Sequence, residues 1–110
     1  MIQGIGIEDR IGHEAAAEHL AYEKALLAVY LLADRSGLSC EAGNAAIARQ
    51  CGLGVGAVKR LLALMRDRGD VKVFGKADGL AYRVIVLMDH PEAEDLVLKI
   101  DQLSRRRIRP

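Results

Sequence analysis

Apolar and polar positions alternate with a helical period over the first third of the chain. From Glu14 to Asp34 the apolar residues recur every three or four positions, which predicts an amphipathic helix. Residues 25–32 are apolar almost all round, as is typical of a central buried helix. Ala16, Leu20, Leu27 and Leu31 share one broad stripe of this helix, with Ala17, Val29 and Leu32 beside it.

Two shorter helical segments follow, with a glycine-containing turn between them. A short extended piece at residues 38–40 precedes a helix from about Asn44 to Gln50. The turn at residues 52–54 then leads into a helix from Val55 to Asp67, which stops at Gly69. The expected core face of this third helix contains Val58, Leu61, Leu62 and Met65.

The period of the pattern changes after Gly69 from that of a helix to that of a strand. Residues 71–74 and 80–87 predict two strands, and the glycine-flanked segment 75–79 predicts the loop of a hairpin. A last helix is expected to begin near Asp89, with Pro91 in its first turn. The predicted fold class is therefore α+β and mostly helical, with a three-helix core, a β-hairpin and an added C-terminal helix.

The length of 110 residues fits one compact domain. We expect an N-terminal arm over residues 1–12, a folded domain over residues 13–88, and a C-terminal helix with a basic tail over residues 89–110. No apolar run approaches the ~20 residues of a membrane span, and the first residues lack a secretory signal. With only two cysteines and no disulfide framework, these features predict a cytoplasmic protein.

The net charge is only +1, but basic and acidic residues are distributed unevenly along the chain. Residues 1–48 hold three basic and seven acidic side chains, whereas residues 49–83 hold eight basic and three acidic ones. The middle of the chain is therefore a basic module that follows an acidic one. A basic module with a helix–turn–helix pattern favours a nucleic-acid partner.

Three features that resemble catalytic or metal sites have simpler interpretations. His13 and His19 are six residues apart, whereas a zinc-protease helix needs two histidines one turn apart, so this segment is expected to be a solvated helix face. The glycine-rich segment 52–56 lacks the third glycine and the preceding strand of a dinucleotide site. Cys40 and Cys51 are expected to be small hydrophobic residues, with a redox pair as the alternative. We predict no enzymatic activity, no cofactor and no metal site.

Four short motifs follow one another in the middle of the chain. They are Ile47-Ala48, Cys51-Gly52-Leu53, Val58-Lys59-Arg60-Leu61 and Arg68-Gly69-Asp70-Val71. With these motifs, residues 25–87 resemble the winged helix-turn-helix domains of bacterial and phage regulators and replication initiators. In that resemblance residues 25–32 are the supporting helix and 44–53 the positioning helix. Residues 58–69 are then the recognition helix and 71–87 the wing.

The resemblance implies that the recognition helix enters the major groove of double-stranded DNA. Lys59 and Arg60 would enter or border the groove, with Arg49 and Arg66 as flanking phosphate contacts. Further contacts to the DNA backbone are expected from the wing and the tail. These are Lys72, Lys76 and Arg83 in the wing, and Arg105, Arg106 and Arg107 in the tail.

The start of the predicted recognition helix departs from the family pattern. Family members usually carry Ser or Thr at its N-cap and polar side chains just after it, whereas this chain has Gly54, Val55, Gly56 and Ala57. None of these four makes a bidentate hydrogen bond to a base edge. Phosphate contacts and DNA shape are therefore expected to dominate over base reading.

We predict a bacterial or phage transcriptional regulator that binds double-stranded DNA as a homodimer. The dimer is expected to form through the first and last helices, because a core of this size has limited room for their leucines. Folding of the last helix onto its own domain is the alternative. Two other functions stay open: a DNA-binding protein of phage or plasmid replication or partitioning, and a winged-helix adaptor or inhibitor that binds protein. No small-molecule effector is evident.

Overall fold

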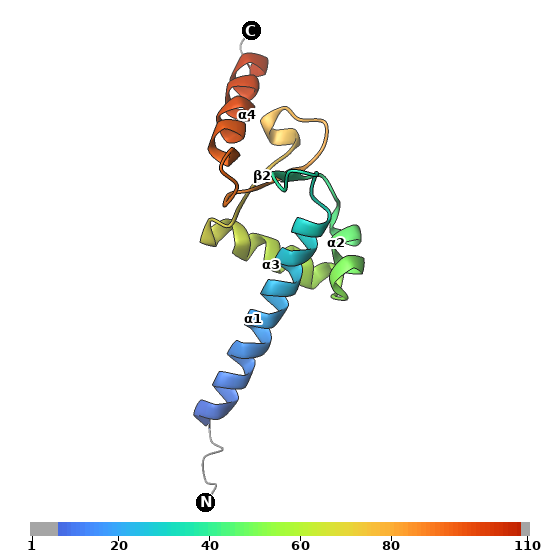
Figure 1. Cartoon of the computed structure of the whole chain (residues 1–110), viewed down its shortest axis with the longest axis vertical. Coiled ribbons are helices and arrows are strands. Elements are labelled where there is room, and N and C mark those ends of the chain that lie inside the picture. Colours follow the sequence, from blue (N-terminus) through green and yellow to red (C-terminus); the bar gives the residue numbers. More distant parts are fainter. Residues whose placement is uncertain (1–6, 109–110) are drawn as a thin grey trace, which may run out of the picture.

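The chain folds into four helices and a three-stranded antiparallel sheet within the residues that the structure describes (Figure 1). The structure is a computed structural model that describes the backbone of residues 7–108 and the side chains of residues 16–105. The helices are α1 (Ile7–Leu31), α2 (Asn44–Cys51), α3 (Val55–Arg68) and α4 (Ala93–Ile108). The strands are β1 (Ser39–Cys40), β2 (Val71–Phe74) and β3 (Val84–Leu87), and a short 3-10 helix, η1 (Lys76–Asp78), lies between β2 and β3. The predicted α+β class is confirmed.

Glycines end both helices of the α2–α3 pair. Gly52 and Gly69 adopt left-handed φ angles of 75° and 81°, which residues with a Cβ rarely adopt. The N–H of Gly52 donates to the carbonyl of Ala48 at 2.8 Å, and the N–H of Gly69 donates to that of Arg66 at 3.1 Å. These local signals place α2 and α3 where the sequence predicts them, with a turn of three residues between.

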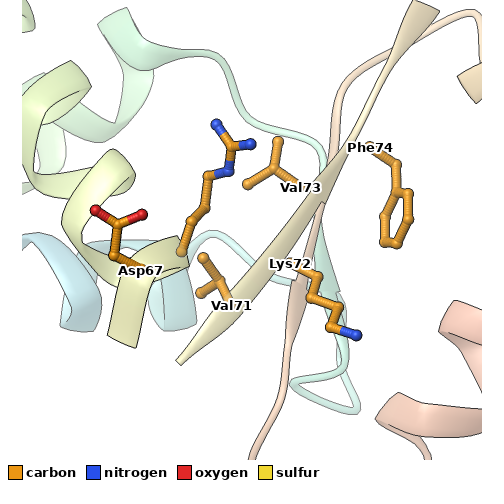
Figure 2. Close-up of a pocket in the computed structure, with 6 residues that line it drawn as sticks. Asp67, Val71, Lys72, Val73 and Phe74 are labelled. Atoms are coloured by element: carbon orange, nitrogen blue, oxygen red, sulfur yellow. The ribbon is translucent and has the colours of Figure 1, made fainter. Parts of the chain in front are cut away.

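The sheet has the order β1-β3-β2, so the last strand lies between the other two. Val71 pairs with Leu87 and Val73 with Ile85, and these residues pack on the core formed with α1, α2 and α3. Alternate residues project to the other side. Figure 2 shows Lys72 and Phe74 on the opposite side of β2 from Val71 and Val73. We call the side of the sheet that packs on α1, α2 and α3 the helix face, and the side that packs on α4 the α4 face.

Each face of the sheet has its own apolar cluster. On the helix face, the predicted core residues Val58, Leu61, Leu62 and Met65 of α3 are all buried, at 6% exposure or less. On the α4 face, Ala93 and Ile100 of α4 are buried against Val86 and Phe74. The last helix therefore covers the sheet of its own chain, as the alternative in the sequence interpretation proposes.

The leucine stripe of α1 points away from the core. Leu20, Leu27 and Leu31 are 56%, 57% and 61% exposed, whereas Ala25 and Val29 are fully buried. The helix α1 therefore carries apolar residues on two opposite sides, of which only one is buried. The side with alanines packs on α2 and α3, since small side chains allow helix axes to approach closely.

Three predicted boundaries also differ from the structure. The first helix begins at Ile7, so residues 7–12 of the predicted arm are helical, and residues 1–6 lie outside the described residues. The second strand begins at Val84 instead of residue 80, because residues 80–83 extend the loop that follows η1. The last helix begins at Ala93, because a turn closed by the Ala93 N–H donating to the His90 carbonyl precedes it.

Tyr22 joins α1 to the junction between α3 and β2. Its side chain is buried, and its hydroxyl donates a hydrogen bond to the carboxylate of Asp70. The Arg68 guanidinium lies over the ring, 4.4 Å from its centroid, in a cation–π contact. Burial, followed by the contact with Asp70, raises the pKa of Tyr22 to about 12. Tyr22 thus connects three elements of the core through one side chain.

Alkaline conditions are expected to unfold the protein. Burial and then the hydrogen bond to Asp89 also raise the pKa of Tyr30 to about 12, as for Tyr22. A tyrosine in the unfolded chain titrates near pH 10. The stability that these neutral hydroxyls provide is therefore complete below about pH 10 and is lost as the pH rises through 12. Parallel titrations by circular dichroism and by absorbance of tyrosinate test this, and an unfolding free energy that stays constant from pH 9 to pH 12 would contradict it.

Candidate nucleic-acid interface

Three basic side chains line one pocket beside α3. The pocket has a volume of about 310 Å³ and is lined by Asn44, Lys59, Leu62, Ala63, Arg66, Val73 and Arg83. None of these seven residues is acidic, and the pocket is bounded by α3, by the start of α2, by β2 and by the residue before β3. We call it the basic pocket. Its positive charge makes it suited to an anion such as a phosphate.

The helical period places Lys59 and Arg66 on one side of α3. They are seven residues apart, which is about two turns, and Leu62 lies between them on the same side. Both side chains are exposed. Within residues 16–105 the ion pairs are His19–Glu23 and Arg60–Glu18, so Lys59 and Arg66 have no carboxylate partner there. These two charges are available to a ligand.

Arg83 forms a wall of the pocket instead of projecting from the hairpin. Its guanidinium donates one hydrogen bond to the carbonyl of Ala42 at 2.7 Å and another to the side-chain oxygen of Asn44. Burial lowers the pKa of Arg83. The sequence predicts Arg83 as a DNA contact from the wing, and in the structure this side chain joins the residue before β3 to the first residue of α2. The sequence interpretation missed Asn44, because a hydrogen bond across 39 residues leaves no local signal.

Replacing Arg83 by alanine is expected to destabilise the fold by about 1–3 kcal/mol. The substitution leaves the carbonyl of Ala42 and the side chain of Asn44 without their partner. Urea unfolding followed by circular dichroism measures the change. Lys59→Ala is the control, because this exposed side chain makes no such bonds and its loss should cost less than about 0.5 kcal/mol. Equal stability of the two variants would show that Arg83 does not hold β3 to α2.

Arg60 is turned toward α1 and is not free. Its guanidinium is hydrogen-bonded to the carboxylate of Glu18, and both side chains remain about half exposed. The sequence interpretation placed Arg60 beside Lys59 at the groove, but the two residues point to different sides of α3. An acidic residue of α1 therefore neutralises one of the predicted contacts.

If α3 lies along duplex DNA, as the sequence predicts, Glu18→Gln should strengthen that binding about threefold, because it frees the charge of Arg60 and removes a negative charge beside α3. An exposed pair of this kind contributes little to folding, so the thermal midpoint should change little. Fluorescence anisotropy with a labelled duplex measures the affinity. Glu94→Gln, on α4, is the control for the loss of one negative charge, and an equal gain in that variant would contradict a local role for Glu18.

The other predicted contacts lie away from the basic pocket. Lys72 is on the α4 face of the sheet, Lys76 is on η1 in the hairpin connection, and Arg49 is exposed on α2. Arg105 is exposed near the end of α4, and the side chains of Arg106 and Arg107 lie outside the described residues. The structure therefore brings Lys59, Arg66 and Arg83 together at the basic pocket, and the other predicted contacts do not line it.

A second hollow adjoins the basic pocket at the outer edge of β2 (Figure 2). It has a volume of about 290 Å³ and is lined by Arg66, Asp67 and residues 71–74. Arg66 lines both hollows, whereas the Asp67 carboxylate lines only this one. Lys72 also lines this second hollow, which therefore has two basic side chains and one acidic side chain.

The start of α3 has only glycines and small apolar residues, over residues 54–57. Gly54 is the N-cap with an ordinary φ of −74°, and a Cβ added at Gly54 or Gly56 would meet nothing within 4 Å. Neither glycine is therefore required by packing or by backbone conformation. Together with Val55, which is 50% exposed, they form a smooth surface that a partner can approach closely.

Comparison with protein-family models, curated proteins and solved structures gives no match for this chain. The geometry of α3 and the basic pocket therefore carries the functional interpretation. None of the helices described is both long enough and apolar enough to cross a membrane.

The histidines and cysteines form no shared site in the described part of the chain. His19 lies 3.9 Å from Glu23 on the exposed side of α1, and no group of three or more potential metal ligands gathers within the described residues. Cys40 is buried and Cys51 is partly buried, and both are free thiols. Burial raises the pKa of the Cys40 thiol.

Proposed function

We propose that this protein binds double-stranded DNA as a winged helix-turn-helix domain. The order of elements supports the proposal: α1, β1, the α2–α3 pair with its three-residue turn, and then the β2–β3 hairpin. In such a domain the second helix of the pair enters the major groove, and the hairpin lies beside it. The helix that takes this position is α3.

The basic pocket is the observation that carries the proposal. Lys59 and Arg66 have no carboxylate partner in the described part of the chain, and Arg83 holds a third positive charge at the pocket wall. A DNA phosphate seated at the mouth of this pocket would contact Lys59 and Arg66 directly. Arg83 would add to the attraction through the pocket wall without giving up its bonds to α2.

Because α3 begins with glycines, we expect recognition to depend on the shape of the DNA. No side chain at residues 54–57 can form the paired hydrogen bonds that read a base edge. A smooth helix end beside a cluster of positive charge instead allows close approach to the sugar–phosphate backbone. We therefore expect modest discrimination between DNA sequences, with groove width and phosphate position as the main determinants.

A salt titration with duplex DNA tests the proposed function. Two or three phosphate contacts predict that the logarithm of the binding constant falls with the logarithm of salt concentration, with a slope of about −2 to −3. Fluorescence anisotropy of a labelled 24-base-pair duplex measures this slope. No binding at about 50 mM salt, or an affinity that does not change with salt, would overturn the proposal and favour a protein-binding adaptor.

Sequencing of the DNA that the protein retains from a pool of random duplexes tests the regulatory role. We propose a transcriptional regulator of a bacterium or phage, and this role predicts enrichment of a short two-fold symmetric site. Uniform recovery of all sequences would contradict a regulator that acts at defined sites. It would favour the replication or partitioning role, which uses the same surface.

A further inference from the structure

The outward side of α1 has the spacing of a coiled-coil seam. Leu20, Lys24, Leu27 and Leu31 follow at intervals of four, three and four residues, which is the repeat of the a and d positions. The three leucines are 56–61% exposed and lie opposite Tyr22 and Val29, which face the core. We call these four residues the leucine face. We propose that the leucine face pairs, in antiparallel orientation, with the leucine face of a second copy of this chain.

The leucine face is an apolar patch on the surface of the molecule. Leu20, Leu27 and Leu31 are 56%, 57% and 61% exposed, whereas the opposite side of the same helical segment packs on the core. Three exposed leucines along one stripe form an apolar patch of the kind that marks an interaction surface. Pairing of residues 20–31 with the same residues of a second copy would remove this patch from water.

The charge of Lys24 favours an antiparallel pair of two copies of this chain. In a parallel pair with helices in register, Lys24 would face Lys24 of the second copy, and the like charges would repel. In the antiparallel pair, Leu20 lies against Leu31 of the second copy, and Lys24 lies against Leu27. The Lys24 stem then covers a leucine, and its ammonium group extends toward the exposed Glu23 of the second copy, beside the seam. Each residue of the leucine face therefore contacts a residue of the leucine face of the second copy, as a two-fold axis requires.

The α4 helix is not the pairing surface in this arrangement. Its apolar side, with Ala93 and Ile100, is already buried on the sheet of its own chain. Figure 1 also shows α4 and the free end of α1 at opposite ends of the molecule. This narrows the predicted dimer interface from two helices to one. The inference does not depend on DNA binding, because the leucine face and the basic pocket share no residue.

Light scattering after size-exclusion chromatography tests the pairing. The wild-type protein at about 100 μM should have twice the chain mass of 12.0 kDa, and Leu27→Glu or Leu20→Glu should halve the measured mass. Leu98→Glu is the matched control, because Leu98 on α4 is as exposed as Leu27 on α1, at 57%. Circular dichroism confirms that each variant is folded. A monomeric wild-type protein, or loss of the dimer in Leu98→Glu alone, would overturn the proposal.

Cysteine cross-linking tests the direction of the pair. In a Cys51→Ser background, which removes the partly exposed native thiol, Leu20→Cys combined with Leu31→Cys should give a disulfide-linked dimer on mild oxidation. Leu20→Cys alone should not, because residue 20 lies far from its own copy in the antiparallel pair. Efficient cross-linking of the single variant would overturn the antiparallel arrangement. The dimer should persist in a Lys59→Glu/Arg66→Glu variant, so failure of the pairing and failure of the DNA-binding proposal are distinguishable.

Discussion

Charge reversal at Lys59 and Arg66 is expected to lower the affinity for duplex DNA about 100-fold. The two side chains are the exposed positive charges of the basic pocket that have no carboxylate partner in the described part of the chain. Replacing both by glutamate removes two attractive contacts and places two negative charges where a phosphate would lie. A 100-fold loss corresponds to ~2.7 kcal/mol of binding free energy, which is in the range for two phosphate contacts and added repulsion.

The salt dependence separates a local effect from a change in net charge. The slope of log affinity against log salt should become less negative by about 2 in the double variant, since two counterion-releasing contacts are lost. The matched control is Lys99→Glu with Arg35→Glu, which changes the net charge equally at two exposed residues that are not predicted contacts. Its affinity should fall threefold or less. Equal losses in both double variants would show that α3 is not the contact surface.

Truncation of Tyr22 to alanine is expected to destabilise the fold by about 3–5 kcal/mol. The ring is 3% exposed, and it fills the space between α1 and α3 beneath the Arg68 guanidinium. Its loss creates a cavity in the core and removes the cation–π contact. Tyr22→Phe keeps the ring and removes the hydrogen bond to Asp70, so it should cost about 1–3 kcal/mol.

Urea unfolding of the two variants measures both contributions. Tyr82→Ala is the control, because Tyr82 is 71% exposed and its truncation should cost less than about 0.5 kcal/mol. The unfolding slope should be the same for all variants if they unfold in one step. A loss below about 1 kcal/mol in Tyr22→Ala would show that Tyr22 does not connect α1 to the core.

The middle of the fold could be predicted from local signals. The helix-stopping glycines Gly52 and Gly69 and the apolar side of α3 define the α2–α3 pair, and the structure has both helices where the sequence predicts them. The pattern also identifies β2, because alternation along residues 71–74 matches a strand with two different faces. Each of these elements is determined by residues that lie close together in the sequence.

The candidate site could be predicted only in part. The sequence identifies Lys59 and Arg66 as outward residues of α3, because the helical period fixes their angle to the buried residues. It does not place Arg83 or Arg60, whose guanidinium groups reach Asn44 and Glu18 from distant parts of the chain. A long flexible side chain takes the nearest acceptor in space, and that acceptor is defined only when the helices have packed.

The amino-acid sequence by itself determined the order of helices and strands, the core side of α3 and the segregation of charge along the chain. The tertiary structure alone decided which apolar side of α1 is buried and which arginines remain free. The physical reason is that the helical period gives the angle between two apolar stripes and not their distances to other elements. On α1 the side with Ala25 and Val29 packed on the core, and Leu20, Leu27 and Leu31 were left on the surface.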